Sequence, residues 1–527
     1  MTPDRVMIWT GRANVGSTEV IEMCGIAGTW GADDPLIVQK MLDRLAHRGP
    51  DAQGVFSAPG EVGTLGHRRL SIVDVHGGDQ PLIAQAATQV RALVANGEIY
   101  NAPRLRDELK GDQRFATRSD SEVILHLLAD ADLLATDRLR GMFAFALSRG
   151  DELILGRDPI GIKPLYTGCH DDHLVFSSEL QAFPPGTSSV EPLPPGTVWS
   201  SRSGESRYYE IPDPEPIRGQ LADQARRVRE ALEEAVVGHL MSDVEVGAFL
   251  SGGLDSSAIV ALARQHVDEL HTFSVGLAGS ADLEAARLVS QHLDTIHHEY
   301  VLEPAEIRAA LPGIIAALES YDQDLVRSAV PTYFTSRLAA DHLKVVLTGE
   351  GADELFAGYR YHKNITSEQA LQADARRSLA ELHHANLQRV DRLTMAHALE
   401  ARVPFLDVNV IETALSIPVG LRRPGEAAPE KAVLRMAVED LLPASIVWRD
   451  KAQFDEGSGT ADLLPDITSD AIDVDRYRAV FPGTLLRSAE ECLYHRLLCE
   501  SLPDPELVLP NVARWDVRLA NGAGSPS

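Results

Sequence analysis

The chain has 527 residues, which is too long for one ordinary domain and predicts two or three. Hydrophobic residues make up 44% and charged residues 24%, a balance typical of globular rather than disordered proteins. With 77 acidic and 49 basic side chains the formal net charge is -28. Such a field repels nucleic acid and anionic membranes, so we expect neither as a partner.

Cysteine usage and hydropathy predict a cytoplasmic protein. No two of the four cysteines have the close spacing of a zinc or redox motif, and so few favour a reducing compartment; they are Cys24, Cys169, Cys492 and Cys499. We find no apolar run of about 18 residues that could span a membrane. Residues 1–22 lack the apolar segment of a signal peptide.

Residues 24–210 predict an α+β domain with antiparallel sheets. Short β-branched and aromatic runs alternate with Gly, Pro and Asp, as in ALVANGEIYN and ELILGRDPIGIKPLY. Two longer periodic stretches, residues 36–45 and 122–128, predict helices. The Pro-rich and charged residues 211–224 predict a linker.

Residues 225–515 predict an α/β domain. A helix over 221–240 precedes the apolar strand VGAFL, a glycine turn and a second apolar helix, and HTFSVGL and KVVLTG are further strands. Near-continuous apolar strands that alternate with helices indicate a parallel sheet covered on both faces. Residues 367–442 are expected to be mostly helical. Residues 516–527 are expected to be disordered.

The first candidate site centres on Cys24 in the run MCGIAG. A thiol is mostly protonated at neutral pH and needs a nearby base to act as a nucleophile. Taken alone, Cys24 is more simply a small buried hydrophobe. It is followed in order, however, by HRGPD (residues 47–51), by Arg69, by NGEIYN (residues 96–101) and by Asp120.

This ordered set resembles the class II glutamine amidotransferases, which are N-terminal-nucleophile hydrolases, over nearly all of residues 24–210. The resemblance implies that Cys24 attacks the glutamine carboxamide and that its own α-amine is the base. It assigns the donors to the oxyanion to Asn96 and Gly97, the α-carboxylate contact to Arg69, and the α-ammonium contacts to Glu98 and Asp120.

The position of Cys24 conflicts with that chemistry, because 23 residues precede it and an amide nitrogen cannot accept the thiol proton. We therefore expect residues 1–23 to be absent from the active protein or removed from it. Translation starting at Met23 with removal of that methionine is the simpler route. A short propeptide cut before Cys24 is the alternative.

The second candidate site follows two of the predicted parallel strands. SGGLDSS (residues 251–257) opens a helix, where small residues and free N–H groups suit an anion, although it is no Walker A loop. TGEGADE (residues 348–354) brings three carboxylates close together, which predicts a bound cation.

These runs, with EARVPFLD, EKAVLR and WRDKAQF further on, resemble the synthetase domain of glutamine-hydrolysing asparagine synthetases over residues 225–500. The resemblance implies ATP and Mg²⁺, and release of AMP and pyrophosphate. It assigns ATP binding to Leu250, Ser251, Gly252, Gly253, Asp255, Ser256, Val275, Thr348 and Gly349; acceptor binding to Arg327, Glu350 and Asp407; metal binding to Asp255 and Asp353; and catalysis to Glu350 and Lys451.

The carboxylate acceptor is expected to be aspartate, and a homodimer is compatible with the resemblance. Residues 328–330 replace the family's Ser-Thr before Pro331, and residues 455–459 (DEGSG) replace its Ser-Asp-Gly run, so amidation of another carboxylate is the first alternative. Cys24 argues against ring closure as in β-lactam synthetases, and SGGLDSS against amidotransferases that share only the first domain. A non-catalytic binding or regulatory protein is a further alternative, disfavoured by intact motifs at both sites.

Overall fold

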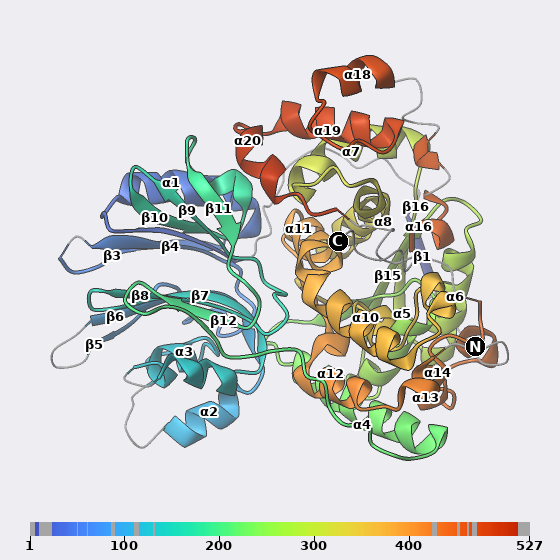
Figure 1. Cartoon of the computed structure of the whole chain (residues 1–527). Helices are drawn as coiled ribbons and strands as arrows, with labels where there is room; N and C mark the ends of the chain where they lie inside the picture. Colours follow the sequence, from blue (N-terminus) through green and yellow to red (C-terminus); the bar gives the residue numbers. More distant parts are fainter. Residues whose placement is uncertain are drawn as a thin grey trace.

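The structure is a computed structural model that describes residues 6–9, 24–49, 51–60, 62–85, 90–109, 115–129, 132–423, 429–450, 454–460, 463–465 and 472–514. It has an amino-terminal part and a carboxyl-terminal part that lie side by side (Figure 1). Among these residues no helix is long and apolar enough to cross a membrane.

The amino-terminal part is a sandwich of two antiparallel sheets, as expected for an α+β domain. One sheet has the order β11-β9-β10-β2-β4-β3 and the other β13-β12-β8-β7-β6-β5. The strands are β2 (Gly25–Trp30), β3 (Ala52–Ser57), β4 (Gly63–Arg69), β5 (Leu82–Gln85), β6 (Val90–Ile99), β7 (Gly141–Arg149), β8 (Glu152–Arg157), β9 (Tyr166–His170), β10 (His173–Ser177), β11 (Ser188–Pro192), β12 (Thr197–Ser200) and β13 (Gly204–Arg207).

Helices cover the two outer faces of this sandwich (Figure 1). The first sheet carries α1 (Pro35–Arg44), and the second carries α2 (Ala102–Leu109) and α3 (Glu122–Leu127). Short 3-10 turns join the elements: η1 (Ala46–Arg48), η2 (Leu133–Arg138) and η3 (Leu180–Ala182). His67 Nε2 lies 3.1 Å from the Ala95 carbonyl oxygen and links β4 to β6 between the sheets.

The carboxyl-terminal part is built on a parallel sheet, which confirms the predicted α/β class. Its order is β1-β16-β15-β14-β17-β18. The strands are β1 (Val6–Trp9), β14 (Val246–Phe249), β15 (His271–Gly276), β16 (Ile296–Val301), β17 (Val345–Leu347) and β18 (Glu400–Arg402). The predicted strands VGAFL, HTFSVGL and KVVLTG are β14, β15 and β17.

Three strands of this sheet were not predicted: β1, β16 and β18. Ile296–Val301 pairs in parallel with β15 inside the sheet. Val6–Trp9, in the segment expected to be an extension, pairs in parallel with β16 at one edge. Glu400–Arg402 pairs with β17 at the other edge, although residues 367–442 were expected to be mostly helical. A three-residue strand is too short to leave a period in the sequence.

Helices pack on both faces of the parallel sheet and form the rest of this part (Figure 1). They are α4 (Leu221–His239), α5 (Leu254–Ala263), α6 (Ala281–Leu293), α7 (Pro304–Leu318), α8 (Gln323–Ala340), α9 (Ala352–Leu355), α10 (Glu368–Glu381), α11 (Asn386–Met395), α12 (Val408–Leu415), α13 (Val419–Arg422), α14 (Ala432–Ala437), α15 (Ala444–Val447), α16 (Phe454–Gly457), α18 (Val474–Val480), α19 (Ala489–Ser501) and α20 (Pro505–Val508). Shorter 3-10 turns are η4 (Arg360–Asn364), η5 (Leu382–His384), η6 (Pro404–Leu406) and η7 (Leu509–Asn511).

The hydrophobic cores cross the boundary between the two parts. Met142 and Ile160 of the sandwich pack in one cluster with α4 and α5, and Ala27 and Val38 pack in another with α7 and α8. Burial of apolar side chains from both parts in shared clusters holds the parts together. The predicted tail, residues 516–527, lies outside the described residues.

Candidate active sites

The first site lies at the ends of three strands of the sandwich. Cys24 immediately precedes β2, Arg69 ends β4, and Asn96, Gly97 and Glu98 lie near the end of β6. Gly97 has a φ of +128°, and a Cβ there would overlap the Met142 carbonyl. Only glycine fits this position.

The Cys24 thiol is partly buried and held by Leu70. The Leu70 N–H donates to Sγ over 3.3 Å. Burial raises the pKa of Cys24 to about 12, because a thiolate loses its hydration there. The thiol is therefore protonated at neutral pH and needs a base to act as a nucleophile.

Asn96 and Glu98 present buried polar atoms that make no hydrogen bond with the described residues at this site. Asn96 Nδ2 and Glu98 Oε2 are buried and have no hydrogen-bond partner within the described part of the chain. A buried polar group without a partner costs free energy unless a ligand satisfies it. Both atoms therefore fit a polar substrate: Nδ2 as a donor to an oxyanion and Oε2 as an acceptor from an ammonium group.

Burial raises the pKa of both carboxylates that are predicted to bind the ammonium group. Asp120 accepts the Ile99 N–H over 2.5 Å, and burial raises the pKa of Asp120 to about 6. Burial, with Asp120 and Glu400 nearby, raises the pKa of Glu98 well above its ordinary value. Arg69 is buried and pairs with Asp79 over 2.7 Å, and the Val73, Asp74 and Val75 carbonyls accept its other N–H groups.

The second site is a cavity of about 1080 Å³ in the carboxyl-terminal part. SGGLDSS follows β14 and TGEGADE follows β17, and parallel neighbours end at the same edge of the sheet. The predicted residues that line the cavity are Leu250, Ser251, Gly253, Asp255, Ser256, Arg327, Thr348, Gly349, Glu350 and Asp353. The sheet edge thus brings both predicted motifs into one site.

A buried lysine that we had not assigned joins the two predicted metal ligands. Lys431 Nζ lies 2.5 Å from Asp255 Oδ2 and 2.5 Å from Asp353 Oδ1. The two carboxylates outweigh burial and raise the pKa of Lys431. The run EKAVLR was visible in the sequence, but its lysine looked no different from a surface lysine.

Glu350 is held by a second residue that the sequence did not reveal. Arg389 of α11 forms an ion pair with Glu350 at the cavity wall. Burial raises the pKa of Glu350, and Arg389 opposes that rise. Burial and Asp353 raise the pKa of the neighbouring Glu354 to about 7. The cavity therefore holds ionised and partly protonated acids side by side.

Three predicted residues that the structure describes do not line the cavity. Gly252 lies behind the loop, where a Cβ would come within 2.5 Å of Ala285 on α6. Val275 is buried in β15, and Asp407 caps α12 by accepting the Asn409 N–H over 2.8 Å. Lys451 lies outside the described residues.

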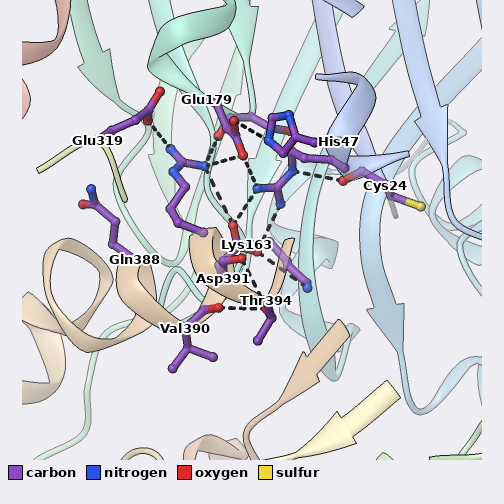
Figure 2. Close-up of polar contacts among 12 residues, drawn as sticks. Cys24, His47, Lys163, Glu179, Glu319, Gln388, Val390, Asp391 and Thr394 are labelled. Atoms are coloured by element: carbon purple, nitrogen blue, oxygen red, sulfur yellow. Dashed lines mark hydrogen bonds and ion pairs between the residues drawn. The ribbon is translucent and has the colours of Figure 1, made fainter. Parts of the chain in front are cut away.

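A buried cluster of charged groups joins the two parts beside Cys24 (Figure 2). Arg48 Nε donates to the Cys24 carbonyl over 3.2 Å, and its Nη atoms donate to Asp391 of α11 over 2.8 and 3.1 Å. Glu179 pairs with Arg48 and with His47 over 2.6 and 2.9 Å. Burial alone would raise the pKa of Glu179. The positive charges of His47, Arg392 and Arg48 outweigh burial and hold this pKa well below its ordinary value. Since α11 also carries Arg389, one helix contacts both sites.

Known proteins resemble both parts of the chain. Residues 23–194 match the glutamine amidotransferase domain family, and residues 227–380 and 363–480 match the asparagine synthase family. Asparagine synthetase B [glutamine-hydrolyzing] of Escherichia coli is 38% identical over 92% of this chain and 92% of its own. Probable glutamine-hydrolysing asparagine synthetases of Dictyostelium discoideum and Schizosaccharomyces pombe are each 36% identical, over 90% and 94% of this chain and 92% and 96% of theirs.

Proposed function

The chain belongs to the family of glutamine-hydrolysing asparagine synthetases, and from this membership we propose how its residues divide the reaction between two sites. It is a carbon–nitrogen ligase that makes asparagine with glutamine as the nitrogen donor. We take residues 24–210 as the glutaminase domain, 211–224 as the linker and 225–515 as the synthetase domain.

In the glutaminase half, Cys24 Sγ attacks the carboxamide carbon of glutamine. The α-amine of Cys24 takes the thiol proton and returns a proton to the leaving nitrogen, so that ammonia departs and a thioester remains. Water then hydrolyses the thioester to glutamate. The unpaired Asn96 Nδ2 and the Gly97 N–H stabilise the oxyanion, an effect often worth about 3 kcal/mol.

In the synthetase half, a carboxylate oxygen of the acceptor attacks the α-phosphorus of ATP and pyrophosphate leaves. Ammonia then attacks the acyl carbon and AMP leaves. The observation that carries this assignment is the cavity of about 1080 Å³, where the loop after β14 meets the acids after β17. Glycines and the start of α5 suit the phosphates, and Lys431 lies close enough to balance their charge.

Mg²⁺ fits the carboxylates at this site. Asp255 and Asp353 already share one cation, Lys431 Nζ, so they converge on a position suited to positive charge. Carboxylate and phosphate oxygens are the ligands that Mg²⁺ prefers. Asp255 and Asp353 would hold the ion, which when bound would neutralise negative charge on the phosphates.

Ammonia has to travel between the sites. An apolar cluster made of Leu70, Ile72, Val345 and Met395 lies against Cys24 and draws on both domains. Apolar side chains admit neutral ammonia but exclude the ammonium ion. This cluster supports transfer inside the protein.

Aspartate is the acceptor that we propose. The segment that departs from the family, residues 328–330, lies on α8, where Ala329 and Val330 are buried in the core. Ser328 and Thr332, one turn apart, line the cavity instead, and their hydroxyl groups donate to carbonyl oxygens of the preceding turn of the chain. Arg327 also lines the cavity and pairs with Glu490 over 2.6 Å.

The division of labour is tested with Cys24→Ala. Because this substitution removes the nucleophile and leaves the second site intact, we expect asparagine from aspartate, ATP and an ammonium salt at an unchanged rate, and none from glutamine. Product analysis should give AMP and pyrophosphate. Asparagine from glutamine alone, or ADP in place of AMP, would contradict the assignment.

A further inference from the structure

Glu98 of the glutamine site meets an arginine from the other domain. Glu98 Oε2 lies 3.6 Å from Arg402 Nη2, an ion pair between β6 and β18. Both side chains are buried, with residue exposures of 5% and 0%. Neither atom has a hydrogen-bond partner among the described residues. Opposite charges attract strongly at such a position because little water screens them.

Arg402 is fixed by its own domain. Its Nε donates to Glu400 over 2.9 Å, and its Nη1 donates to the carbonyls of His239 and Met241 over 2.7 Å each. The direction of Nη2 therefore does not depend on Glu98. The synthetase domain presents a preoriented positive charge to the glutamine site.

The surroundings of Glu98 oppose its ionisation. Burial, Asp120 before α3 and Glu400 on β18 raise its pKa, whereas Arg402 and Lys163 lower it. Tyr100, two residues further on, lies with its ring 5.7 Å from the Arg402 guanidinium carbon. A carboxyl group must be ionised to bind an ammonium group well.

We propose that Arg402 is a positioning residue of the glutamine site. This proposal rests on the proposed role of Glu98 as the partner of the glutamine α-ammonium group. Arg402 favours the ionised form of the Glu98 carboxylate and orients it, so the glutamine site is complete only when the synthetase domain is docked. The Arg402 carbonyl also accepts the Thr348 N–H over 2.9 Å, so the same strand supports the ATP site.

The test compares Arg402→Gln with Glu400→Gln in glutaminase assays from pH 5.5 to 9. Arg402→Gln removes the favourable charge. We expect kcat/KM for glutamine to fall about 30-fold, mostly through KM, and its acid limb to move up by about one pH unit. Glu400→Gln removes an opposing charge from the same strand, and its amide oxygen can still accept the Arg402 Nε–H. Its acid limb should move down.

The acid limbs of the two variants should move in opposite directions if the effect is electrostatic. Damage to β18 would instead move both acid limbs in the same direction. If Arg402→Gln does not fold, Arg402→Lys, which keeps the charge, should raise KM several-fold and leave the acid limb in place. Unchanged acid limbs in Arg402→Gln and Glu400→Gln, or an upward shift in Glu400→Gln, would overturn the inference. A Glu98→Gln variant with an unchanged KM for glutamine would instead refute the proposed role of Glu98.

Discussion

At the scale of single residues, Lys431 shows how contacts decide a role that residue type leaves open. A lysine is usually exposed and solvated, and a buried one requires a partner. Lys431 is 3% exposed and lies between two carboxylates at the edge of the sheet. Its ammonium group is therefore positioned both to hold these acids together and to meet incoming phosphates.

Replacement of Lys431 with Met should abolish synthesis while sparing the glutaminase. The variant keeps side-chain length but leaves two partly buried carboxylates facing each other without a cation, so we expect at least about a 100-fold loss of pyrophosphate release. Glutamate formation from glutamine should stay within about twofold of wild type. Lys363→Met is the matched control, because Lys363 is exposed and approaches Glu430 only to 3.8 Å. Equal losses in both variants would rule out a special role for Lys431.

The Cys24 thiol requires a base that its surroundings do not supply. Its pKa of about 12 means that almost no thiolate forms spontaneously at neutral pH. We expect a protein whose first residue is Cys24 to hydrolyse glutamine, and one with residues 1–23 attached to lack this activity, because the α-amine is then an amide. Intact mass and N-terminal sequencing identify each form before the assay. Full glutaminase activity with residues 1–23 attached would exclude the α-amine as the base.

At the scale of elements, strands β15 and β16 carry a cluster of histidines that makes the parallel sheet sensitive to acid. His298 Nε2 lies 2.9 Å from His271 Nδ1, and the His342 ring centroid is 3.9 Å from that of His298. Burial lowers the pKa of His298 to about 4 and that of His297 to about 3. His297 and His298 are therefore packed in their neutral forms.

Stability should consequently fall as the pH drops below about 6.5. Above that value the folded and unfolded chains are both neutral at these positions. Below that pH the unfolded chain binds protons at these histidines and the folded chain does not. The free energy of unfolding therefore falls by up to about 1.4 kcal/mol per pH unit for each histidine, until the pH reaches the pKa of the folded state.

We expect His298→Gln to flatten the dependence of Tm on pH between 6.5 and 4.5. Thermal unfolding followed by circular dichroism measures this slope. The exposed His266→Gln serves as the control and should leave it unchanged. A slope in His298→Gln as steep as in wild type would show that the acid sensitivity lies elsewhere.

At the scale of the whole molecule, the domains are joined by shared cores and by buried charges, so the interface behaves as part of one folded unit. Arg48 contacts Cys24 from one side and Asp391 from the other (Figure 2). Removing one partner of a buried ion pair is costly because the other charge stays buried.

Asp391→Asn should therefore lower the free energy of unfolding by about 3 kcal/mol. Urea unfolding followed by fluorescence measures the change. Asp213→Asn is the matched control, because Asp213 forms an exposed pair with Arg376 over 3.2 Å and should contribute less than about 1 kcal/mol. Equal effects of the two substitutions would contradict the central role of this cluster.

The sequence by itself determined the fold class and most of both sites. The helix over residues 36–45 and the strands VGAFL and KVVLTG were visible because local hydrophobic periodicity and glycine turns encode them. SGGLDSS and TGEGADE were visible because phosphate and cation chemistry restricts residue types over short spans. Such signals survive without tertiary structure since their causes lie within a few neighbouring residues.

Only the tertiary structure decided which distant residues meet. Three pairs of residues that are distant in the sequence are in contact: Lys431 with Asp255, Arg389 with Glu350, and Arg402 with Glu98. Asp407 does not line the cavity and caps α12 instead. The first two pairs are 176 and 39 residues apart in the chain. Their contact follows from the strand order of the sheet and from docking of the two domains. The strand order and the docking of the domains are stabilised by the burial of apolar surface and by the pairing of buried charges. Both depend on the whole fold rather than on any one segment.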